Sequence, residues 1–528
     1  MRRLCFVAVF VLAMIAAGCG GSSVQPPPPG GSFSVASLHG QYAFSMSGAD
    51  LNGAYIARIG SFTADGAGNV TGGLEDVLNL GSGQAASVVS FTGGSYQVQS
   101  NGSATITLNA ASGGSLQLSM VMQSTSNGFL VQTDLTASSS GSFNLQTNAD
   151  FTPAALGNPY VFRTLGVSFA TQNAAPLSLV GKILADGNGH ITGGVMDTND
   201  GNQTAPSGAT VIAPGTYALD TNGNGTNFGR GTMVFNGRTF AFYIVDTTHF
   251  KMLEEDALGS STGDAVQQAG AIPTENAQFT GSFVYLIGGS TVLGTEGAVT
   301  RAARFTADGN GGLGAISLDD NIGGWYRHIS QGSNISAATY AMDTANSGSG
   351  RGTFTFTDSS GGTYSDVFYL ISPTQAVAQE TSKGVIGNGP MYAQTGGPFT
   401  VSGSAGNFVS NWNGVQLGSS TAVPYEEDFV NQYTLTNTNS GNINGVTDYV
   451  QLGISTQTLF TKVNLGGTLT INNDGTANNQ YKFVVNGSPS ITVNFQAYFA
   501  NPGTVLLVCS DSARTTAGII YQQQTPSQ

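Results

Sequence analysis

Aspartates recur in pairs with one fixed spacing along this chain of 528 residues. The pairs, with members eleven residues apart, are Asp65 and Asp76, Asp186 and Asp197, Asp308 and Asp319, and a fainter copy formed by Asn437 and Asp448. Counting alternate residues places Asp76 on the strand face of Val70, and Asp197 on the face of Ile191. The second aspartate of each pair is therefore a candidate ligand-binding carboxylate that points into a closed unit. The alternative is that it ends a strand and bonds the next turn.

The segment from Asn321 to His328 is the most distinctive loop, because it places Trp325, Tyr326 and Arg327 next to one another. The corresponding loops of the other copies hold ordinary turn residues. An aromatic pair beside an arginine can stack on a sugar or another flat ligand, and loops on a rigid scaffold are where binding differences accumulate. The alternative is that the tryptophan plugs the end of its own unit.

A second acidic position recurs after a late apolar strand of each copy. Its members are Asp134, Glu255, Glu380 and Asp511. A secreted hydrolase is therefore one alternative function, with a site formed by the Trp325 loop and nearby acids.

Other patterns with catalytic or metal-binding potential are incomplete. The four histidines, His39, His190, His249 and His328, are isolated from one another and form no pair at metal-ligand spacing. Ser261 lies in a Gly-x-Ser-x-Gly pattern that lacks the strand-to-helix context of a nucleophile elbow. The segment 220–225 begins like a calcium loop, but Gly231 stands where a bidentate glutamate is required. We therefore predict no catalytic residue, metal site or cofactor.

The aspartate pairs belong to a longer repeated phrase that predicts β-hairpins. Its copies span 62–73, 184–194, 305–313 and, more faintly, 435–445. Apolar residues that flank an Asp-Gly or Asn-Gly turn are the local signal of a hairpin. The 75 glycines and the low charged fraction of 9% also favour short strands and many turns over helices.

The repeats divide the exported chain into four similar units. Each unit opens with glycine and an aromatic strand, at Gly40, Gly157, Gly281 and Gly406, and closes on a glutamine, at Gln146, Gln267, Gln394 and Gln522. The closing residues are roughly 120 to 130 residues apart, which is the size of a small domain. We predict an all-β protein of four tandem antiparallel meander units, with boundaries at 33–150, 151–272, 273–396 and a divergent 397–528. Closure into up-and-down barrels removes exposed edges, and β-sandwiches are the alternative.

In this pattern the units resemble the calycin-type barrels of avidins and lipocalins. The resemblance implies that the opening Gly-aromatic strand pairs with the last strand and shuts the cylinder. The Gly-x-Trp signature of lipocalins is missing from all four openings. The resemblance therefore supports a prediction of the fold. One alternative function is that of a carrier, in which each barrel encloses a small apolar ligand as lipocalins do.

The first residues form a secretory signal, because Arg2 and Arg3 precede a short apolar run that ends in small residues. The end of this run, from Ile15 to Cys19, resembles the lipobox of bacterial prolipoproteins, although the family more often has leucine at the position of Ala16. The resemblance implies a signal peptide at 1–18 and lipidation of Cys19, and the alternative is release as a soluble secreted protein. Residues 19–32 are rich in proline and glycine and form an extended tether.

The residue after the cysteine is a glycine, whereas the family's usual inner-membrane retention signal is an aspartate. The resemblance therefore implies the outer membrane or the cell surface as the destination.

Composition also excludes several partners and bonds. The net charge is −14, so clustered Lys and Arg for phosphate contacts are lacking and nucleic acid is an unfavourable partner. Cys5 leaves with the signal and Cys19 is lipidated, which leaves Cys509 without a disulfide partner.

We therefore predict a lipid-anchored extracytoplasmic or cell-surface protein with a non-enzymatic binding or surface-interaction role. Its predicted partners are the membrane, through the N-terminal lipid, and a surface glycan or protein. The candidate ligand-binding residues are Trp325, Tyr326, Arg327, Asp76, Asp197, Asp319 and Asp448.

Overall fold

The structure is a computed structural model that describes residues 32–526, except for short gaps. The gaps are 84, 170–173, 204–205, 221–227, 293–296, 332–333, 383, 418–424, 437–440, 454–455, 473–474, 476–479 and 488–489. The predicted signal peptide, Cys19, nearly all of the tether and Asn437 therefore lie outside the described residues. None of the helices in the described ranges is long and apolar enough to cross a bilayer.

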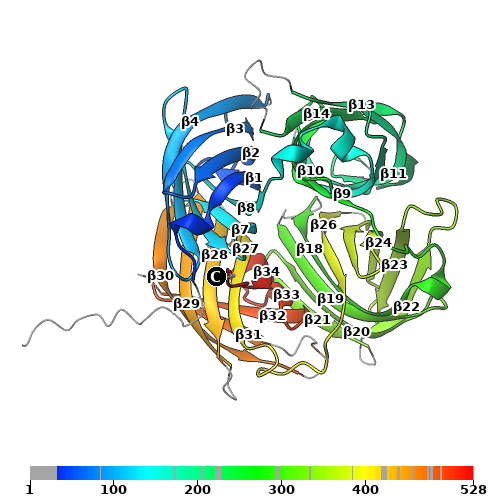
Figure 1. The fold of residues 1–528 in the computed structure, drawn as a ribbon. Helices are drawn as coiled ribbons and strands as arrows, with labels where there is room; N and C mark the ends of the chain where they lie inside the picture. The colour runs from blue at the N-terminus through cyan, green and yellow to red at the C-terminus, as the bar shows by residue number, and fades with distance from the viewer. Residues whose placement is uncertain are drawn as a thin grey trace, which may run out of the picture.

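The predicted all-β fold of four tandem antiparallel units is confirmed (Figure 1). In the first and fourth units, eight consecutive strands close into a barrel. The first barrel comprises β1 (His39–Asp50), β2 (Tyr55–Asp65), β3 (Asn69–Asn79), β4 (Ser87–Val98), β5 (Ser103–Ala110), β6 (Ser115–Met122), β7 (Asn127–Gln132) and β8 (Ala137–Leu145). The fourth comprises β27 (Gly406–Gln416), β28 (Tyr425–Leu435), β29 (Asn442–Gly453), β30 (Thr456–Thr470), β31 (Gln480–Val485), β32 (Ile491–Asn501), β33 (Thr504–Cys509) and β34 (Arg514–Gln522).

The second and third units each contain nine strands in one antiparallel sheet. The second comprises β9 (Pro159–Ser168), β10 (Ala175–Ala185), β11 (His190–Asp200), β12 (Ser207–Val211), β13 (Gly215–Leu219), β14 (Arg230–Phe235), β15 (Arg238–Asp246), β16 (His249–Glu254) and β17 (Gly259–Gln267). The third comprises β18 (Thr280–Thr291), β19 (Ala298–Asp308), β20 (Leu313–Ile322), β21 (Trp325–Ser330), β22 (Ile335–Met342), β23 (Arg351–Asp358), β24 (Thr363–Ser372), β25 (Gln375–Glu380) and β26 (Val385–Ala393).

The opening strand of every unit pairs with its last strand, as the calycin resemblance implies. These pairs are β1 with β8, β9 with β17, β18 with β26, and β27 with β34. The second unit also pairs β10 with β11, so its sheet returns on itself. In the third unit an isolated bridge links Gly312, just before β20, to Thr339 of β22. The units are therefore wrapped sheets, and we call them the first to fourth barrels.

Four short 3-10 helices complete the described secondary structure, at η1 (Val35–Ser37), η2 (Asn148–Asp150), η3 (Pro153–Leu156) and η4 (Asn276–Gln278). Three of them precede a barrel and are tied to it by a tyrosine hydroxyl. Tyr96 donates to the carbonyl of Leu38, Tyr217 to that of Pro153, and Tyr340 to that of Phe279. These short segments fix how the chain enters the first three barrels.

The interior of each barrel is filled by its own apolar cluster. Trp412 illustrates this packing, because it is 0% exposed and its ring lies against Phe429, Phe483 and Phe495. Close packing of this kind leaves the barrel axis occupied by side chains.

The repeated phrase forms the hairpin between the second and third strands. In the first barrel, Asp65 Oδ1 accepts hydrogen bonds from the backbone N–H groups of Ala67 and Asn69, at 2.7 and 2.9 Å. Gly66 and Gly68 adopt φ values of 77° and 102°, which side chains rarely tolerate. The carboxylates of Asp186 and Asp308 cap their turns in the same way.

A β-bulge directly after this hairpin changes which side chains face the core. The pairing of β2 with β3 shifts register between Thr63 and Ala64. One extra residue moves all later side chains to the opposite face. Val70 therefore points into the first barrel, whereas Asp76 points out of it. Period-two counting from Val70 predicted the wrong face for Asp76 because it ignored this bulge.

The second and third barrels carry the same shift, but the fourth barrel differs. Pairing of β28 with β29 continues without a shift from Ile443 to Asp448. These two residues are separated by one position fewer than Val70 and Asp76. The missing residue compensates for the missing bulge, so Asp448 also points away from its own core.

Each barrel packs against the next, and the fourth packs against the first, so the barrels form a closed ring (Figure 1). An apolar cluster lies at each of the four contacts. Representative pairs are Ile59 with Leu253, Val180 with Val377, Leu286 with Leu506, and Val131 with Val450. The outward faces of the barrels are thus partly apolar because they meet one another.

Candidate functional site

A glutamine just after the last strand of each barrel reaches into the neighbouring barrel. The side-chain amide of Gln146 donates to the carbonyl oxygens of Phe228 and Ile244 in the second barrel, at 3.0 and 2.5 Å. Gln268 makes the equivalent bonds to Ser349 and Leu370 in the third barrel. Each of these two amides thus bonds two carbonyl groups of the next barrel, one at the end of a loop and one in a strand.

The same device closes the ring. The amide of Gln523 donates to the carbonyl oxygens of Asn101 and Met122 in the first barrel, at 2.9 and 2.8 Å. Gln394 reaches Phe499 in the fourth barrel at 2.8 Å. In the second and fourth barrels the bridging residue is therefore the one after the closing glutamine identified in the sequence.

The recurring aspartates Asp76 and Asp197 lie at these contacts and bind an arginine and a tyrosine of the next barrel. Asp76 is 0% exposed and accepts bonds from Arg230 Nε at 2.8 Å, from Arg230 Nη2 at 2.6 Å and from the Tyr243 hydroxyl at 2.8 Å. Burial and the adjacent carboxylate raise the pKa of Tyr243 well above its ordinary value. The hydroxyl therefore stays protonated and donates to Asp76.

Asp197 repeats this arrangement with the third barrel. Arg351 Nε and Nη2 both donate to its carboxylate at 2.8 Å, and the Tyr369 hydroxyl donates at 2.6 Å. Both sites are bidentate ion pairs, which are among the strongest hydrogen-bonded contacts in proteins.

Asp319 and Asp448 occupy the same position at the remaining two contacts, without an arginine. Asp319 accepts bonds from the hydroxyls of Tyr498, in the fourth barrel, and Tyr326. Asp448 accepts the backbone N–H of Lys462 at 2.9 Å. Burial raises the pKa of Asp448 to about 6, against opposing contributions from Lys462 and Ser119 of the first barrel. The four predicted aspartates thus lie at four separate contacts and do not form one site.

The Trp325 hairpin brings together the other predicted site residues. Trp325 is 86% exposed and does not plug its barrel. Tyr326 and His328 both contact the Asp319 carboxylate, and His328 Nδ1 lies 3.1 Å from it. The hydrogen bond with Asp319 raises the pKa of His328. Arg327 donates to Asp320 at 3.0 Å.

The turn of this hairpin is braced by the fourth barrel. The backbone N–H of Gly324 donates to Thr515 Oγ1 at 2.9 Å, and the Asn321 amide donates to the carbonyl of Cys509 at 2.7 Å. Trp325 is therefore held on a rigid base while its ring faces solvent, which makes it a candidate contact surface.

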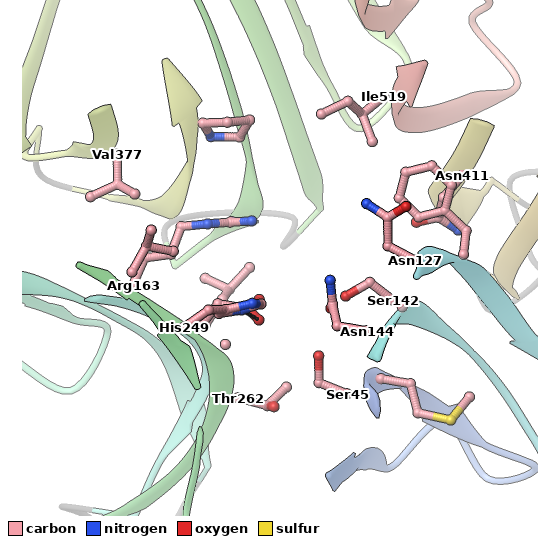
Figure 2. Close-up of a pocket in the computed structure, with 18 of the residues that line it drawn as sticks. Ser45, Asn127, Ser142, Asn144, Arg163, His249, Thr262, Val377, Asn411 and Ile519 are labelled. Carbon is pink, nitrogen blue, oxygen red and sulfur yellow. Dashed lines mark hydrogen bonds and ion pairs between the residues drawn. The ribbon is translucent and has the colours of Figure 1, made fainter. Parts of the chain in front are cut away.

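A cavity of about 660 Å³ lies where all four barrels meet. In Figure 2, Arg163 and His249 of the second barrel reach into it from one side. Asn144 of the first barrel and Asn411 of the fourth barrel lie on the other side. Val377 represents the third barrel in the lining. This central cavity is our candidate functional site.

Charged groups of the second barrel form one wall of the central cavity. His249 Nε2 lies 2.8 Å from Asp264 Oδ1, and Lys251 Nζ lies 3.1 Å from the same oxygen. Lys251 is 0% exposed and also donates to Ser45 and Ser142 of the first barrel. Burial would raise the pKa of Asp264, but Lys251 and His249 outweigh it and hold that pKa well below its ordinary value.

Uncharged polar groups supply most of the remaining polar surface. The hydroxyls of Tyr392 and Tyr521 lie 3.0 Å apart, across the contact of the third and fourth barrels. Asn388 donates to the carbonyl of Thr164 at 2.7 Å and to Ser178 Oγ at 2.8 Å. The Oδ1 of Asn388 then faces Arg163 Nη1 at 3.4 Å. These fixed amides and hydroxyls can accept and donate hydrogen bonds to a polar ligand.

The sequence did not single out the cavity residues, because none belongs to the repeated phrase or to a recognisable motif. Of the histidines treated as isolated, His249 lies in the lining. The one signal in the sequence was the excess of acidic over basic residues. Because basic residues are few, the partner of each arginine is worth identifying in the structure.

Groups with catalytic or metal-binding potential elsewhere are occupied by structural bonds. Ser261 lies on strand β17, is buried and donates to Glu254 at 2.7 Å. In the described ranges, no group of three or more His, Cys, Asp or Glu is arranged to hold a metal ion. Asp134 and Asp511, of the second acidic set, accept the backbone N–H groups of Gln117 and Asn494.

Comparisons with known proteins identify no family. No family model matches the chain, and no curated protein matches it. Solved structures with some similarity include transferrin binding protein B from serogroup B Neisseria meningitidis, with 8% identity, a TM-score of 0.20, and coverage of 76% of this chain and 84% of that chain. A mutant of transferrin binding protein B from Haemophilus parasuis has 11% identity, a TM-score of 0.19 and the same coverage of 76% and 84%. The binding activity in those names describes those proteins alone.

Proposed function

We propose that this chain is an extracytoplasmic, lipid-anchored binding protein without catalytic activity, and that its ligand is a polar molecule held in the central cavity. The supporting observation is the ring itself. Four barrels with filled interiors meet at a cavity to which every barrel contributes side chains. Cavities of about 300 to 1,000 Å³ that combine apolar surface with a few fixed polar groups are typical ligand sites.

A carrier of apolar ligands inside the barrels is less well supported. Aromatic side chains occupy the barrel axes, as Phe44 and Phe62 do in the first barrel and Trp412 does in the fourth. A ligand would have to displace this packed core at a cost of several kcal/mol. Binding between barrels requires no such displacement.

A hydrolase centred on the Trp325 hairpin is also less well supported. Asp319 is 0% exposed, and its two oxygens accept bonds from Tyr326 and Tyr498. A general acid or base must reach the substrate within hydrogen-bond distance. Trp325 itself supports a contact role, because its exposed ring offers a stacking face to a glycan or a protein.

Blocking the cavity tests the binding proposal. We expect Asn144→Trp to abolish binding of saccharide ligands by the full chain, because the larger ring would occupy space that the ligand needs. Asn109→Trp, on the exposed surface of the same barrel, is the matched control and should bind normally. Titration calorimetry with a panel of neutral and acidic oligosaccharides measures both variants. Equal binding by Asn144→Trp and the control would contradict a site in the cavity.

Labelling with a palmitate analogue tests the anchor separately. Cells that express the full chain should incorporate the label, and Cys19→Ala should not. Protease treatment of intact cells should cleave the protein only if it faces outward. An unlabelled wild-type chain would refute the lipid anchor, and the binding proposal would then apply to a soluble secreted protein.

A further inference from the structure

The charge of the central cavity is opposite to that of the whole chain. Acids outnumber bases in the sequence by 30 to 16. Of the described residues that line the cavity, Asp264 is the one acid, whereas Arg163 and His249 are basic. The negative charge of Asp264 is offset by Lys251 at 3.1 Å. Counted together with Lys251, which lies buried behind the lining, these groups carry one more fixed positive charge than negative.

Arg163 lies opposite Asp264 in the pairing of β17 with β9, and its charge helps to lower the pKa of Asp264, but in the described part of the chain its guanidinium forms no ion pair with a carboxylate. Among the described residues, its guanidinium donates one hydrogen bond, from Nη1 to Asn388 Oδ1 at 3.4 Å. By contrast, Arg230, Arg351 and Arg514 each form an ion pair at a contact or in a core. A guanidinium carries five N–H donors in a planar fork that fits a carboxylate. In Figure 2 the guanidinium of Arg163 extends into the cavity, where these donors are free to bind a ligand.

The groups around Arg163 fit a polyhydroxylated molecule. The hydroxyls of Tyr392 and Tyr521 lie close enough for its charge to lower the pKa of each against the effect of burial. Asn144, Asn411 and other amides line the opposite walls. Amides and hydroxyls that both donate and accept match the hydroxyl groups of a sugar, whereas an ionised inorganic anion only accepts and would leave the amide oxygens without a partner.

An aromatic face completes the site. The rings of Phe129 and Tyr521 stack on each other, with centroids 5.7 Å apart and an interplanar angle of 11°, and both residues line the cavity. Sugar rings present C–H groups that pack on such aromatic surfaces. A cation for a ligand carboxylate, hydroxyl and amide partners for sugar hydroxyls, and aromatic residues are therefore present in one cavity.

We infer that the central cavity binds an acidic saccharide, with a uronic-acid carboxylate on Arg163 and the sugar hydroxyls on the surrounding amides and tyrosines. This inference rests on the proposed binding function and specifies its ligand class. Arg163 is the residue that selects acidic over neutral sugars.

Calorimetry on the full chain with matched ligands tests this inference. The probes are digalacturonate and the neutral galactose disaccharide, with inorganic phosphate and an acidic peptide as further arms. We expect digalacturonate to bind at least about tenfold more tightly than the neutral sugar, as one hydrogen-bonded charge pair provides. Arg163→Gln should weaken digalacturonate binding by about 10- to 100-fold and weaken neutral binding much less, so that the preference disappears.

Two further variants keep the result interpretable. Arg163→Lys retains the charge but loses the planar fork, so an intermediate affinity is expected. Lys482→Gln removes an exposed positive charge outside the lining and should bind as the wild type does. Melting curves show whether each variant is folded.

The outcomes separate this inference from the proposed function. If neutral and acidic sugars bind equally and Asn144→Trp abolishes both, the charge selection is wrong and the cavity remains a binding site. If phosphate or the acidic peptide binds through Arg163 and digalacturonate does not, the saccharide class is wrong. If no member of the panel binds, both proposals fall.

Discussion

The contact between the first and second barrels and the contact between the fourth and first barrels use the same backbone geometry but different charges. In the first contact, Asp76 is neutralised by Arg230 and bonded by Tyr243. In the second barrel, strand pairing places Arg230 opposite Tyr243. The corresponding pair in the first barrel is Ser103 and Val121. The aspartate of the fourth barrel, Asp448, therefore meets a first barrel without either partner.

The ring-closing contact uses a different buried acid instead. Asp428 accepts hydrogen bonds from Ser138 Oγ and Ser140 Oγ of the first barrel, at 2.7 and 2.6 Å. Burial raises the pKa of Asp428 to about 7, and the two serines only partly oppose this. A shared scaffold thus supports both an ion-paired contact and one in which Asp428 and Asp448 form no ion pair within the described residues. The difference makes ring closure sensitive to pH, whereas the contact of the first two barrels depends on a salt bridge.

The largest effect is expected from removal of the arginine. Arg230→Ala leaves the Asp76 carboxylate buried and uncompensated, which costs about 3 to 5 kcal/mol in the free energy of unfolding. Urea denaturation followed by tyrosine fluorescence measures this loss in the first transition. Lys482→Ala, at an exposed position, is the control and should cost less than about 0.5 kcal/mol. A similarly small loss of unfolding free energy in both variants would show that the ion pair does not stabilise the fold.

The second effect is the pH dependence of the ring-closing contact. Because the folded-state pKa of Asp428 is about 7 and its ordinary value is 3.8, the folded chain binds more protons than the unfolded chain between these values. Stability should therefore fall as pH rises through this range, by at most about 4 kcal/mol. Melting temperatures of wild type and Asp428→Asn, measured from about pH 5 to about pH 8, check this. The asparagine variant should give a flatter profile, while Glu275→Gln should follow the wild type. Identical slopes in all three would rule out Asp428 as the titrating group.

The glutamine bridges should give the next effect. Gln523→Ala and Gln146→Ala each remove two hydrogen bonds to buried carbonyls, which costs about 1 to 3 kcal/mol. The chain still links the first two barrels in Gln146→Ala, but no chain segment links the fourth to the first. Small-angle scattering should therefore show ring opening, as an increased radius of gyration, in Gln523→Ala alone. Equal expansion of both variants would show that the contact between the fourth and first barrels opens no more easily than the contact between the first and second barrels.

The smallest effect on stability is expected from Trp325, whose hairpin belongs to the third barrel and contacts the fourth barrel. Trp325→Ala should change the free energy of unfolding by less than about 0.5 kcal/mol, because the ring is exposed and Gly324 still bonds Thr515. By comparison, Trp412→Ala should cost about 3 to 5 kcal/mol as a core truncation. Denaturation of both variants checks this, and a binding assay with surface ligands shows whether Trp325 contributes contacts. A large stability loss for Trp325→Ala would mean that its ring is part of the contact.

Prediction from sequence succeeded where the determining interactions are local. The Asp-Gly turns at Asp65, Asp186 and Asp308 identified hairpins because the carboxylate, the glycines and the strands all lie within a few residues. The face of Asp76 was not predicted correctly, because a single bulge residue reverses the alternation and nothing in the local pattern requires a bulge.

The sequence alone determined the strand-rich composition, the hairpin repeat and the fourfold division, because turn chemistry and alternation are properties of neighbouring residues. Only the tertiary structure decided that the four barrels form a ring, that Gln523 returns to the first barrel, and that Arg163 faces a shared cavity. These features depend on contacts between residues hundreds of positions apart. A glutamine or an arginine on the outside of a strand suits solvent as well as an interface, so its partner is defined only when the barrels are packed together.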